Sequence, residues 1–300
     1  MGVKRSTALG EFLRSRRARI QPADVGLGDF GGLRRVPGLR REELAMLAGV
    51  SVDHYIRLEQ GRSVNFSEAV LDAVARVLQL DDTEREHLYN LARPSTGPGS
   101  ASDEIAGPCG ADASCVVAYD GAVQEVRPGL RRLLDAVGDV PAYVVGPRSE
   151  VLAWNAAAAA VFTDFGALPV AERNWARLTF LDEGMRDLFD DWTGKAEDMV
   201  AFLRLEAGRR PGDAELCSLV GELSIRSPEF VELWARHEVK DKTHGSKVLR
   251  HPLVGEFELS YETLRLPSDP DQMLLTYTAE PGPAQDALRL VLAASSLRVS

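Results

Sequence analysis

The stretch REELAMLAGVSVDHYIRLEQGR (residues 41–62) contains and adjoins side chains that bind anions and the edges of bases. A guanidinium group pairs with phosphate oxygens and can pair bidentately with O6 and N7 of guanine. A carboxylate repels phosphate but accepts a hydrogen bond from N4 of cytosine. The arginines here are Arg40, Arg41, Arg57 and Arg62, and Asp53 is a carboxylate on the same segment as Arg57. This set of groups favours recognition of nucleic acid over catalysis.

Two short helices joined by a tight turn would position these groups. Gly49 permits the positive φ that a three-residue turn needs, and Ala45 is small enough for the second helix to cross closely. Ser51 is a good N-cap for that second helix. We expect a shared core of Leu44, Ala48, Val50, Tyr55 and Leu58. The side chains left exposed would be Val52, Asp53, His54, Ile56 and Arg57. From this pattern alone, an ordinary helical corner remains the alternative.

Charge is unevenly distributed along the chain. The net charge is -10, yet residues 1–62 carry twelve Lys and Arg against seven Asp and Glu, which gives +5 and leaves -15 for residues 63–300. Backbone N–H groups at the start of the first helix would add to the anion binding of Arg40 and Arg41. A basic N-terminal part therefore favours a DNA-binding device over a plain helical corner.

Apolar periodicity predicts a helical N-terminal domain. Helices are expected, with no strand, at residues 9–20, 41–48, 51–60, 65–80 and 81–92. Residues 94–114 are rich in Pro, Gly, Ser and Ala and are typical of a linker. We therefore expect a first domain over 1–93, a linker over 94–114 and a second domain over 115–300.

The segment ELAMLAGVSVDHYIRLEQGR resembles the helix-turn-helix of the phage-repressor-like (lambda-repressor-like), or Xre, family, over about residues 9–92. The resemblance implies a five-helix DNA-binding domain in which Val52, Asp53 and Arg57 face base edges. His54 would lie near an edge or the DNA backbone, and Arg41 and Arg62 would hold phosphates. Arg57 is the best candidate for direct readout of guanine.

The same resemblance implies a structural ion pair between Glu59 and Arg17. The loop from residue 21 to residue 39 is longer than the minimal family pattern and carries Arg34 and Arg35. These two arginines either add phosphate contacts or belong to a solvated basic loop. A palindromic double-stranded operator requires a twofold dimer, so a homodimer is expected.

Beyond the linker, helical and strand patterns are mixed. Helices are expected at residues 129–137, 156–162, 184–210, 214–225, 228–237 and 283–294. Strands are expected at residues 141–147, 150–155, 255–266 and 272–280. Two strands, then helices, then further strands predict an α+β domain with a small antiparallel sheet.

The chain as a whole resembles a narrower group, the MmyB-like regulators of actinobacteria, which join this N-terminal domain to a PAS-like ligand-binding domain. The matching segments include VLAWN (151–155), DDWTGKAEDMVAFLR (190–204), SPEFVELWARHEV (227–239) and HPLVGEFELSYETL (251–264). The resemblance implies a transcription regulator that senses a small molecule, apolar or lipid-like, without a bound cofactor. The alternative is a ligand-free scaffold that dimerises the DNA-binding domains.

Aromatic side chains supply the material for a ligand pocket, and a few polar groups could converge on it. The candidates are Trp154, Asn155, Trp175, Phe180, Trp192, Arg204, Phe230, Trp234, His237 and His251. For each aromatic residue taken singly, ordinary core packing is the competing interpretation.

Other chemistries have weaker support. His237, His244 and His251 recur every seven residues, but the intervening KDKTHGSK is loop-like and lacks helical zinc-ligand spacing, so no metal is expected. No nucleophile elbow, GxGxxG or P-loop appears, and we expect no enzyme. Cys109 and Cys115 are expected to be free thiols, with a redox sensor as the alternative. No membrane span or secretory signal is evident, which predicts a cytoplasmic protein.

Overall fold

The computed structural model describes residues 5–27, 38–61, 66–92 and 124–299. The chain divides into two units, which are described separately. Unit 1 comprises Met1–Tyr119, Arg204–Glu222 and Trp234–Lys240. Unit 2 comprises Asp120–Leu203, Leu223–Leu233 and Asp241–Ser300. The linker expected at 94–114 and the boundaries at 93 and 115 lie outside the described residues and stay predictions.

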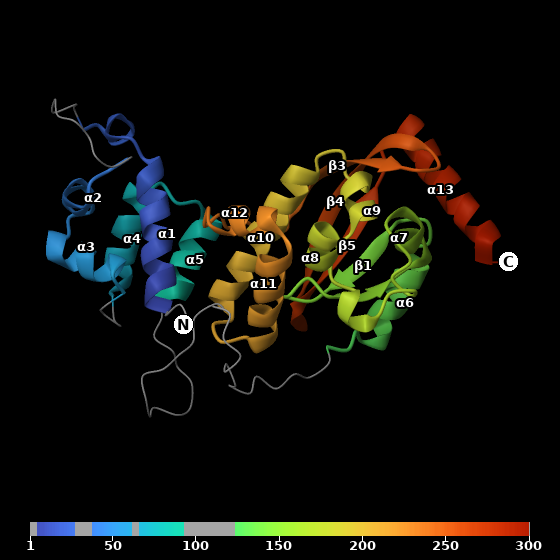
Figure 1. Ribbon diagram of the computed structural model, residues 1–300, viewed down its shortest axis with the longest axis horizontal. Helices are drawn as coiled ribbons and strands as arrows, with labels where there is room; N and C mark the ends of the chain where they lie inside the picture. The colour runs from blue at the N-terminus through green and yellow to red at the C-terminus, as the bar shows by residue number, and fades with distance from the viewer. Residues whose placement is uncertain (1–4, 28–37, 62–65, 93–123, 300) are drawn as a thin grey trace. The chain divides into compact units, whose positions relative to one another are not determined.

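Unit 1 is helical in its described residues, as expected for the N-terminal part (Figure 1). The N-terminal helices are α1 (Arg5–Arg19), α2 (Arg41–Ala48), α3 (Val52–Glu59), α4 (Glu68–Val77) and α5 (Asp82–Ala92), with a short 3-10 helix, η1 (Pro22–Val25). The unit also contains the end of α10 (Trp192–Arg209) and most of α11 (Ala214–Arg226). The five predicted N-terminal helices are confirmed, with ends that differ by a few residues.

The turn between α2 and α3 is built as the sequence predicts. Gly49 has a φ of 67°, and Ser51 caps α3 by accepting a hydrogen bond from the backbone N of His54 at 3.2 Å. Leu44, Ala45, Tyr55 and Leu58 are fully buried. Ala48 and Val50 are only partly buried, but they pack against the same core.

The core of unit 1 joins the N-terminal helices to later segments of the chain. Leu205 of α10 and Val239 are buried in the same apolar cluster as Phe12 and Leu88. A buried ion pair between Arg16 and Glu84, 2.6 Å long, holds α1 to α5. These N-terminal helices therefore do not bury their core by themselves.

Unit 2 is built on an antiparallel sheet with the strand order β2-β1-β5-β4-β3. Its strands are β1 (Ala142–Val145), β2 (Val151–Trp154), β3 (His244–His251), β4 (Gly255–Leu266) and β5 (Asp269–Thr278). The helices of this part are α6 (Pro128–Ala136), α7 (Ala156–Val161), α8 (Trp175–Leu181), α9 (Glu183–Leu188), α12 (Pro228–Trp234) and α13 (Pro283–Val299), with η2 (Val170–Glu172). The predicted α+β class is confirmed.

Both faces of the sheet are covered at its centre. On one face, Ala142, Val144 and Leu274 pack with α6. On the other face, Tyr143 contacts Phe162, Trp175 and Tyr277, and Tyr277 contacts Phe162, with ring centroids 4.9–5.9 Å apart. Successive residues of β1 thus point to opposite faces and are all buried.

Two predictions for this region were wrong, and one short helix was missed. The helix expected over 184–210 is two helices, α9 and α10, because the backbone between them pairs with β3: Asp190 N donates to Val248 O at 3.1 Å. The segment KDKTHGSK, expected as a loop, leads into β3, a polar strand that pairs with β4. Helix α8 was not predicted; Asn174 caps it by accepting from the backbone N of Ala176 and Arg177.

Candidate functional site

Helix α3 presents one buried face and one exposed face. Val52, Asp53, His54 and Arg57 are exposed, as predicted, whereas Ile56 is half-buried. Arg57 Nη2 lies 2.8 Å from Asp53 Oδ2, and both side chains are more than half exposed. The predicted base-reading side chains therefore share one face of a short helix, with a cation and an anion already paired.

On the buried side of α3, the carboxylate of Glu59 forms ion pairs that hold this helix in place. Its carboxylate pairs with Arg17 Nη2 at 3.0 Å and with Arg41 Nε at 2.5 Å, which confirms the predicted pair with Arg17. Arg17 also donates to Leu39 O at 2.6 Å, just ahead of α2. The pairing with Glu59 raises the pKa of Arg41 above its usual value. One carboxylate thus ties together α1, α2 and α3.

Of the candidate phosphate-binding arginines, only Arg40 and Arg41 lie within the described residues. Arg40 is exposed at the N-cap of α2, where its backbone N donates to Glu43 Oε2 at 2.7 Å. Arg41, at the first residue of α2, is 45% exposed in its side chain although Glu59 holds its Nε. Arg34, Arg35 and Arg62 lie outside the described residues. The phosphate contacts of all five remain predictions.

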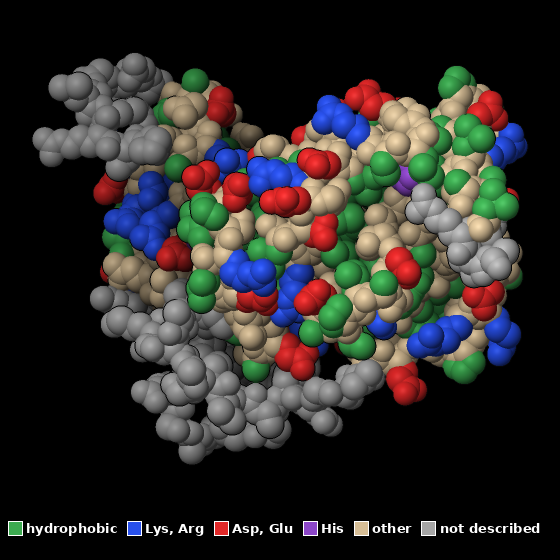
Figure 2. Space-filling model, turned by 45° about the vertical axis from the view of Figure 1, so that its right-hand side comes forward, with side chains coloured by type: hydrophobic (Ala, Val, Ile, Leu, Met, Phe, Trp, Pro, Cys, Tyr) green, Lys and Arg blue, Asp and Glu red, His purple; other side chains and the backbone are tan. Residues whose placement is uncertain are grey.

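The surface agrees with the uneven charge of the sequence. Figure 2 shows a group of Lys and Arg side chains over the N-terminal helices. Elsewhere on the same face, acidic and basic side chains are interspersed with apolar ones. A group of exposed cationic side chains is an electrostatic feature that DNA binding requires.

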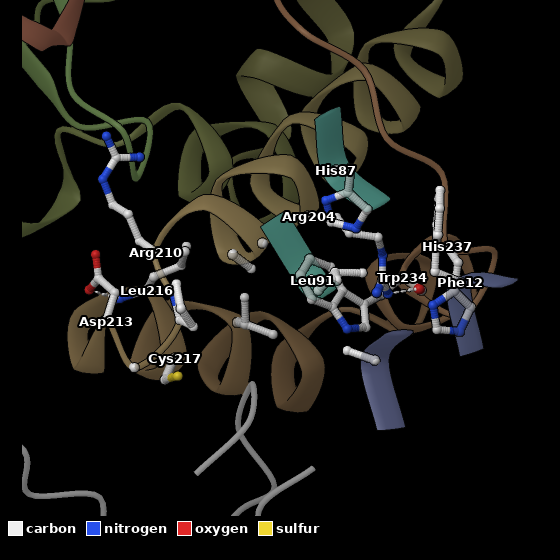
Figure 3. Close-up of a pocket in the computed structure, with 16 residues that line it drawn as sticks. Phe12, His87, Leu91, Arg204, Arg210, Asp213, Leu216, Cys217, Trp234 and His237 are labelled. Carbon is white, nitrogen blue, oxygen red and sulfur yellow. Dashed lines mark hydrogen bonds between the residues drawn. The ribbon is translucent and has the colours of Figure 1, made fainter. Parts of the chain in front are cut away.

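A pocket lies within unit 1, between the N-terminal helices and the later segments of the chain (Figure 3). Its lining comes from α1, α5, α10 and α11, from the turn between α10 and α11, from the end of α12 and from His237. The labelled residues are Phe12, His87, Leu91, Arg204, Arg210, Asp213, Leu216, Cys217, Trp234 and His237. In this view, Phe12 and His237 lie at one end, and Asp213 and Cys217 lie at the other.

Three of the predicted ligand-binding residues meet in this pocket. Arg204 is 8% exposed, donates to Trp234 O and stacks on the Trp234 ring, with the guanidinium carbon 4.1 Å from the ring centroid. Burial lowers the pKa of Arg204 to about 10 and that of His237 to about 4. His237 also adopts a left-handed backbone, with a φ of 57°.

No sequence pattern indicated that the N-terminal helices would share this pocket. Phe12 and Leu91 were attributable only to an apolar helix face, and His87 sits within a polar stretch of α5. His87 is 3% exposed, and burial followed by the charge of Arg204 lowers its pKa to about 3. Gly208 makes this proximity possible, because a Cβ there would lie 2.5 Å from the imidazole ring of His87.

The other predicted ligand-binding residues belong to unit 2. Trp175 is fully buried within the aromatic cluster that it forms with Tyr143, Phe162 and Phe165. Trp154 contacts Phe165 of this cluster. Asn155 has a structural role. Its Oδ1 accepts from the backbone N of Ala142 and Ala158, and its Nδ2 donates to Val140 O at 2.7 Å.

A separate aromatic group contains Phe180, Trp192 and Phe230, whose rings lie 5.2–6.0 Å apart around Phe180. Trp192 Nε1 donates to Thr179 O at 2.9 Å, which fixes the ring against α8. His251 is buried at the end of β3 and accepts from Leu253 N at 3.3 Å. The structure therefore distributes the ten candidates over several clusters instead of one pocket.

Two lysines that were not predicted lie against aromatic rings of unit 2. Lys195 Nζ lies 4.7 Å from the Trp175 ring centroid, and Lys242 Nζ lies 4.0 Å from that of Phe202. Burial and the neighbouring lysines lower the pKa of Lys195 to about 7, and burial lowers that of Lys242 to about 8. Neither ammonium group forms an ion pair with a described carboxylate. Trp175 Nε1 is also buried without a hydrogen-bond partner.

The described residues hold no group of three or more His, Cys, Asp or Glu side chains arranged to bind a metal ion. His244 and His251 stand at opposite ends of β3. Cys217 is a free, buried thiol, whereas Cys109 and Cys115 lie outside the described residues. None of the helices in the described ranges is long and apolar enough to cross a membrane.

The fold and the surface of α3 define a helix-turn-helix protein with a second, α+β domain. Comparison with known families agrees: residues 8–88 match a helix-turn-helix domain, and residues 126–292 match the MmyB-like transcription regulator ligand binding domain. The chain belongs to this family of MmyB-like transcription regulators. No curated protein matched the chain. The narrower Xre assignment stays a prediction.

Proposed function

We propose that the protein regulates transcription by reading a specific DNA sequence with α3. The observation that supports this proposal is the division of α3 into a buried face, with Tyr55, Leu58 and Glu59, and an exposed face, with Asp53 and Arg57. A helix-turn-helix inserts such an exposed face into the major groove. Arg57 is the side chain that can distinguish guanine there, and Val52 and His54 lie beside it on the same helix.

We further infer that the protein acts in the cytoplasm as a homodimer on a palindromic operator. One eight-residue helix reads only a few base pairs, so two copies related by a twofold axis are needed for a specific site. Dimerisation is measurable by sedimentation of the full chain with and without DNA.

A comparison of the variants Arg57→Ala and Arg40→Ala tests whether Arg57 recognises the base sequence. The operator is first obtained by selection from random DNA, and affinities are then measured by fluorescence anisotropy. Arg57→Ala is expected to weaken operator binding about ten- to hundredfold and to leave random DNA nearly unaffected. Arg40→Ala, at an exposed N-cap, should weaken both and lower the salt slope by about one. Equal losses on both DNAs for Arg57→Ala would refute the proposed readout.

We also propose that the ligand-binding domain senses a small apolar or lipid-like molecule. The aromatic side chains around Trp175 provide apolar surface, and the ammonium group of Lys195, which lies over the Trp175 ring, provides polar attachment; Lys242 lies over the ring of Phe202. A few directed polar groups against an apolar lining are typical of small-molecule sites.

Native mass spectrometry of the purified full chain tests this sensing role. A co-purified compound whose removal changes operator affinity would support it. A ligand-free protein whose operator affinity does not respond to cell extract would support the alternative, a scaffold that only dimerises the DNA-binding domains.

A further inference from the structure

The chain contains few lysines, and three of them lie together in unit 2. Of its 35 Lys and Arg residues, the lysines are Lys4, Lys195, Lys240, Lys242 and Lys247. The charges of Lys242 and Lys247 both act on Lys195. Arginine is always charged in a protein, whereas a buried lysine can become a neutral nucleophile near pH 7. Neighbouring lysines in a chain that otherwise uses arginine therefore point to amine chemistry.

The amine of Lys195 lies over two aromatic rings near the start of α10. Its Nζ is 4.7 Å from the ring centroid of Trp175 and 5.0 Å from that of Phe189. Lys195 is half-buried, so the rings shield the side chain while the residue keeps some surface in contact with solvent. These rings provide apolar surface for the body of an organic molecule whose polar end meets the amine.

The charged groups around this amine are mainly cations. Asp198, one turn along α10, is the acid whose charge acts on Lys195, but Asp198 Oδ2 lies 2.9 Å from Lys247 Nζ and pairs with it. Lys242 is also half-buried, with its Nζ 4.0 Å from the ring centroid of Phe202. Two lysines and one carboxylate thus act on Lys195, and the carboxylate is shared with Lys247.

These surroundings favour the neutral form of Lys195. Burial, followed by the charges of Lys242 and Lys247, lowers its pKa to about 7, and the charge of Asp198 opposes this shift. About half of the Lys195 amines are therefore neutral at pH 7, whereas fewer than about one in a thousand ordinary lysines are. A desolvated lysine beside other cations is the arrangement that activates an amine as a nucleophile.

We propose that Lys195 forms a reversible imine with a small aldehyde that has an apolar body. The lone pair of Nζ attacks the carbonyl carbon and gives a carbinolamine, which then loses water to leave a C=N bond. The carbonyl oxygen leaves with the two protons of the amine, so the reaction needs no oxidant, reductant or further reactant. This inference names a reactive class of ligand for the proposed sensing, and its effect on DNA rests on that proposed function.

Reductive trapping in the full chain tests the covalent step without DNA. The protein is incubated with 3-phenylpropanal and sodium cyanoborohydride, which reduces an imine to a stable secondary amine, and peptide mass spectrometry locates the adduct. At about pH 6.5, Lys195 is expected to be labelled at least about tenfold faster than Lys4 and Lys240, because an ordinary lysine supplies little neutral amine there. Glycolaldehyde, which lacks an apolar body, should label Lys195 more slowly than 3-phenylpropanal does.

Two arginine variants separate the reactive amine from its charge. Lys195→Arg keeps a cation beside Trp175 but cannot form an imine, so the total lysine adduct at about pH 6.5 should fall at least about fivefold. Lys247→Arg is the matched control, because arginine keeps the charge and the means to pair with Asp198. This control should change the labelling rate of Lys195 by less than about twofold.

The pH profile of labelling tests the effect of the neighbouring cations. The rate at Lys195 is expected to rise with a midpoint near pH 7. Lys242→Met removes one of the two cations and keeps an apolar side chain beside Phe202, so it should move this midpoint to higher pH. A purely structural role for Lys195 would not produce such a shift.

The proposal is overturned if Lys195 is labelled no faster than Lys4 and Lys240, if glycolaldehyde labels it as fast as 3-phenylpropanal, or if Lys195→Arg leaves the total lysine adduct unchanged. A midpoint that stays at the same pH in Lys242→Met would also overturn it. Operator affinity measured in parallel separates the two proposals. A protein that binds its operator and responds to cell extract, but forms no adduct at Lys195, contradicts only the imine.

Discussion

Replacement of Glu59 by Gln should loosen the three helices that position the reading face. Glu59 is 4% exposed and is the shared acceptor for Arg17 and Arg41. Gln has the same shape but no charge, and it can offer only one oxygen. We therefore expect Glu59→Gln to leave Arg17 as a poorly compensated cation in the interior of the domain.

The magnitude follows from the exposure of the two partners. Removing one partner of a buried ion pair costs about 3–5 kcal/mol. The pair with Arg17, whose side chain is 11% exposed, belongs in that class, whereas the side chain of Arg41 is 45% exposed and its pair contributes about 1 kcal/mol or less. Since Gln keeps one hydrogen bond, we expect a net loss of about 3 kcal/mol in the free energy of unfolding of this domain.

Hydrogen exchange of peptides that cover α1 and α3 measures this loss in the full chain. A loss of about 3 kcal/mol accelerates exchange from globally protected amides roughly hundredfold. Glu42→Gln, at an exposed position of α2, is the matched control and should change exchange less than about threefold. If Glu59→Gln exchanged like Glu42→Gln, the buried carboxylate would not hold the helices together, and the reasoning would be refuted.

Three further perturbations address other contacts. Burial lowers the pKa of His87 to about 3, so the unfolded chain takes up its proton first; the stability that its neutral ring contributes is complete above about pH 6.5 and should fall by about 2 kcal/mol between pH 7 and pH 5. In urea titrations, His87→Gln should reduce the total loss over this range by about that amount but not abolish it, because the pKa of His237 is also lowered, to about 4. In thermal melts, Gly208→Ala should destabilise the folded chain by about 1–3 kcal/mol, because the added Cβ would clash with His87. Gly221→Ala, which has open space around it, should instead stabilise the folded chain by up to about 1 kcal/mol. Asn155→Ala should cost about 2–4 kcal/mol in the same melts, since three buried backbone groups lose their partner; an unchanged melting temperature would contradict this role.

Local signals made much of the fold predictable. The α2–α3 turn was predictable because Gly49 and Ser51 have specific backbone roles that few other residues fill. β3 was not predictable, since a strand with only one neighbour in the described sheet tolerates the polar residues that otherwise indicate a loop. The break before α10 was hidden for a related reason: it depends on pairing with β3, which lies far along the chain.

The candidate sites were predictable to a different extent. The face of α3 follows from spacing within eight residues, so sequence alone placed Asp53 and Arg57 together. The pocket of unit 1 required packing between segments more than a hundred residues apart, and no pattern in α5 indicated that His87 would meet Arg204. Aromatic residue type correctly indicated burial for Trp175 but could not distinguish a core cluster from a cavity lining.

If α3 reads DNA as proposed, the pair between Arg57 and Asp53 would affect how the protein behaves on DNA that is not its target. A carboxylate in the middle of the reading face repels the phosphates of any duplex, so each random encounter is held less tightly. In the proposed readout, Arg57 would give up its bond to Asp53 only where a base edge offers a better partner, and it would reach that edge already oriented. On other sequences the protein would then dwell for a shorter time, and less of it would be held at non-target sites. A negative charge that lowers overall affinity can thereby speed the search for the correct site.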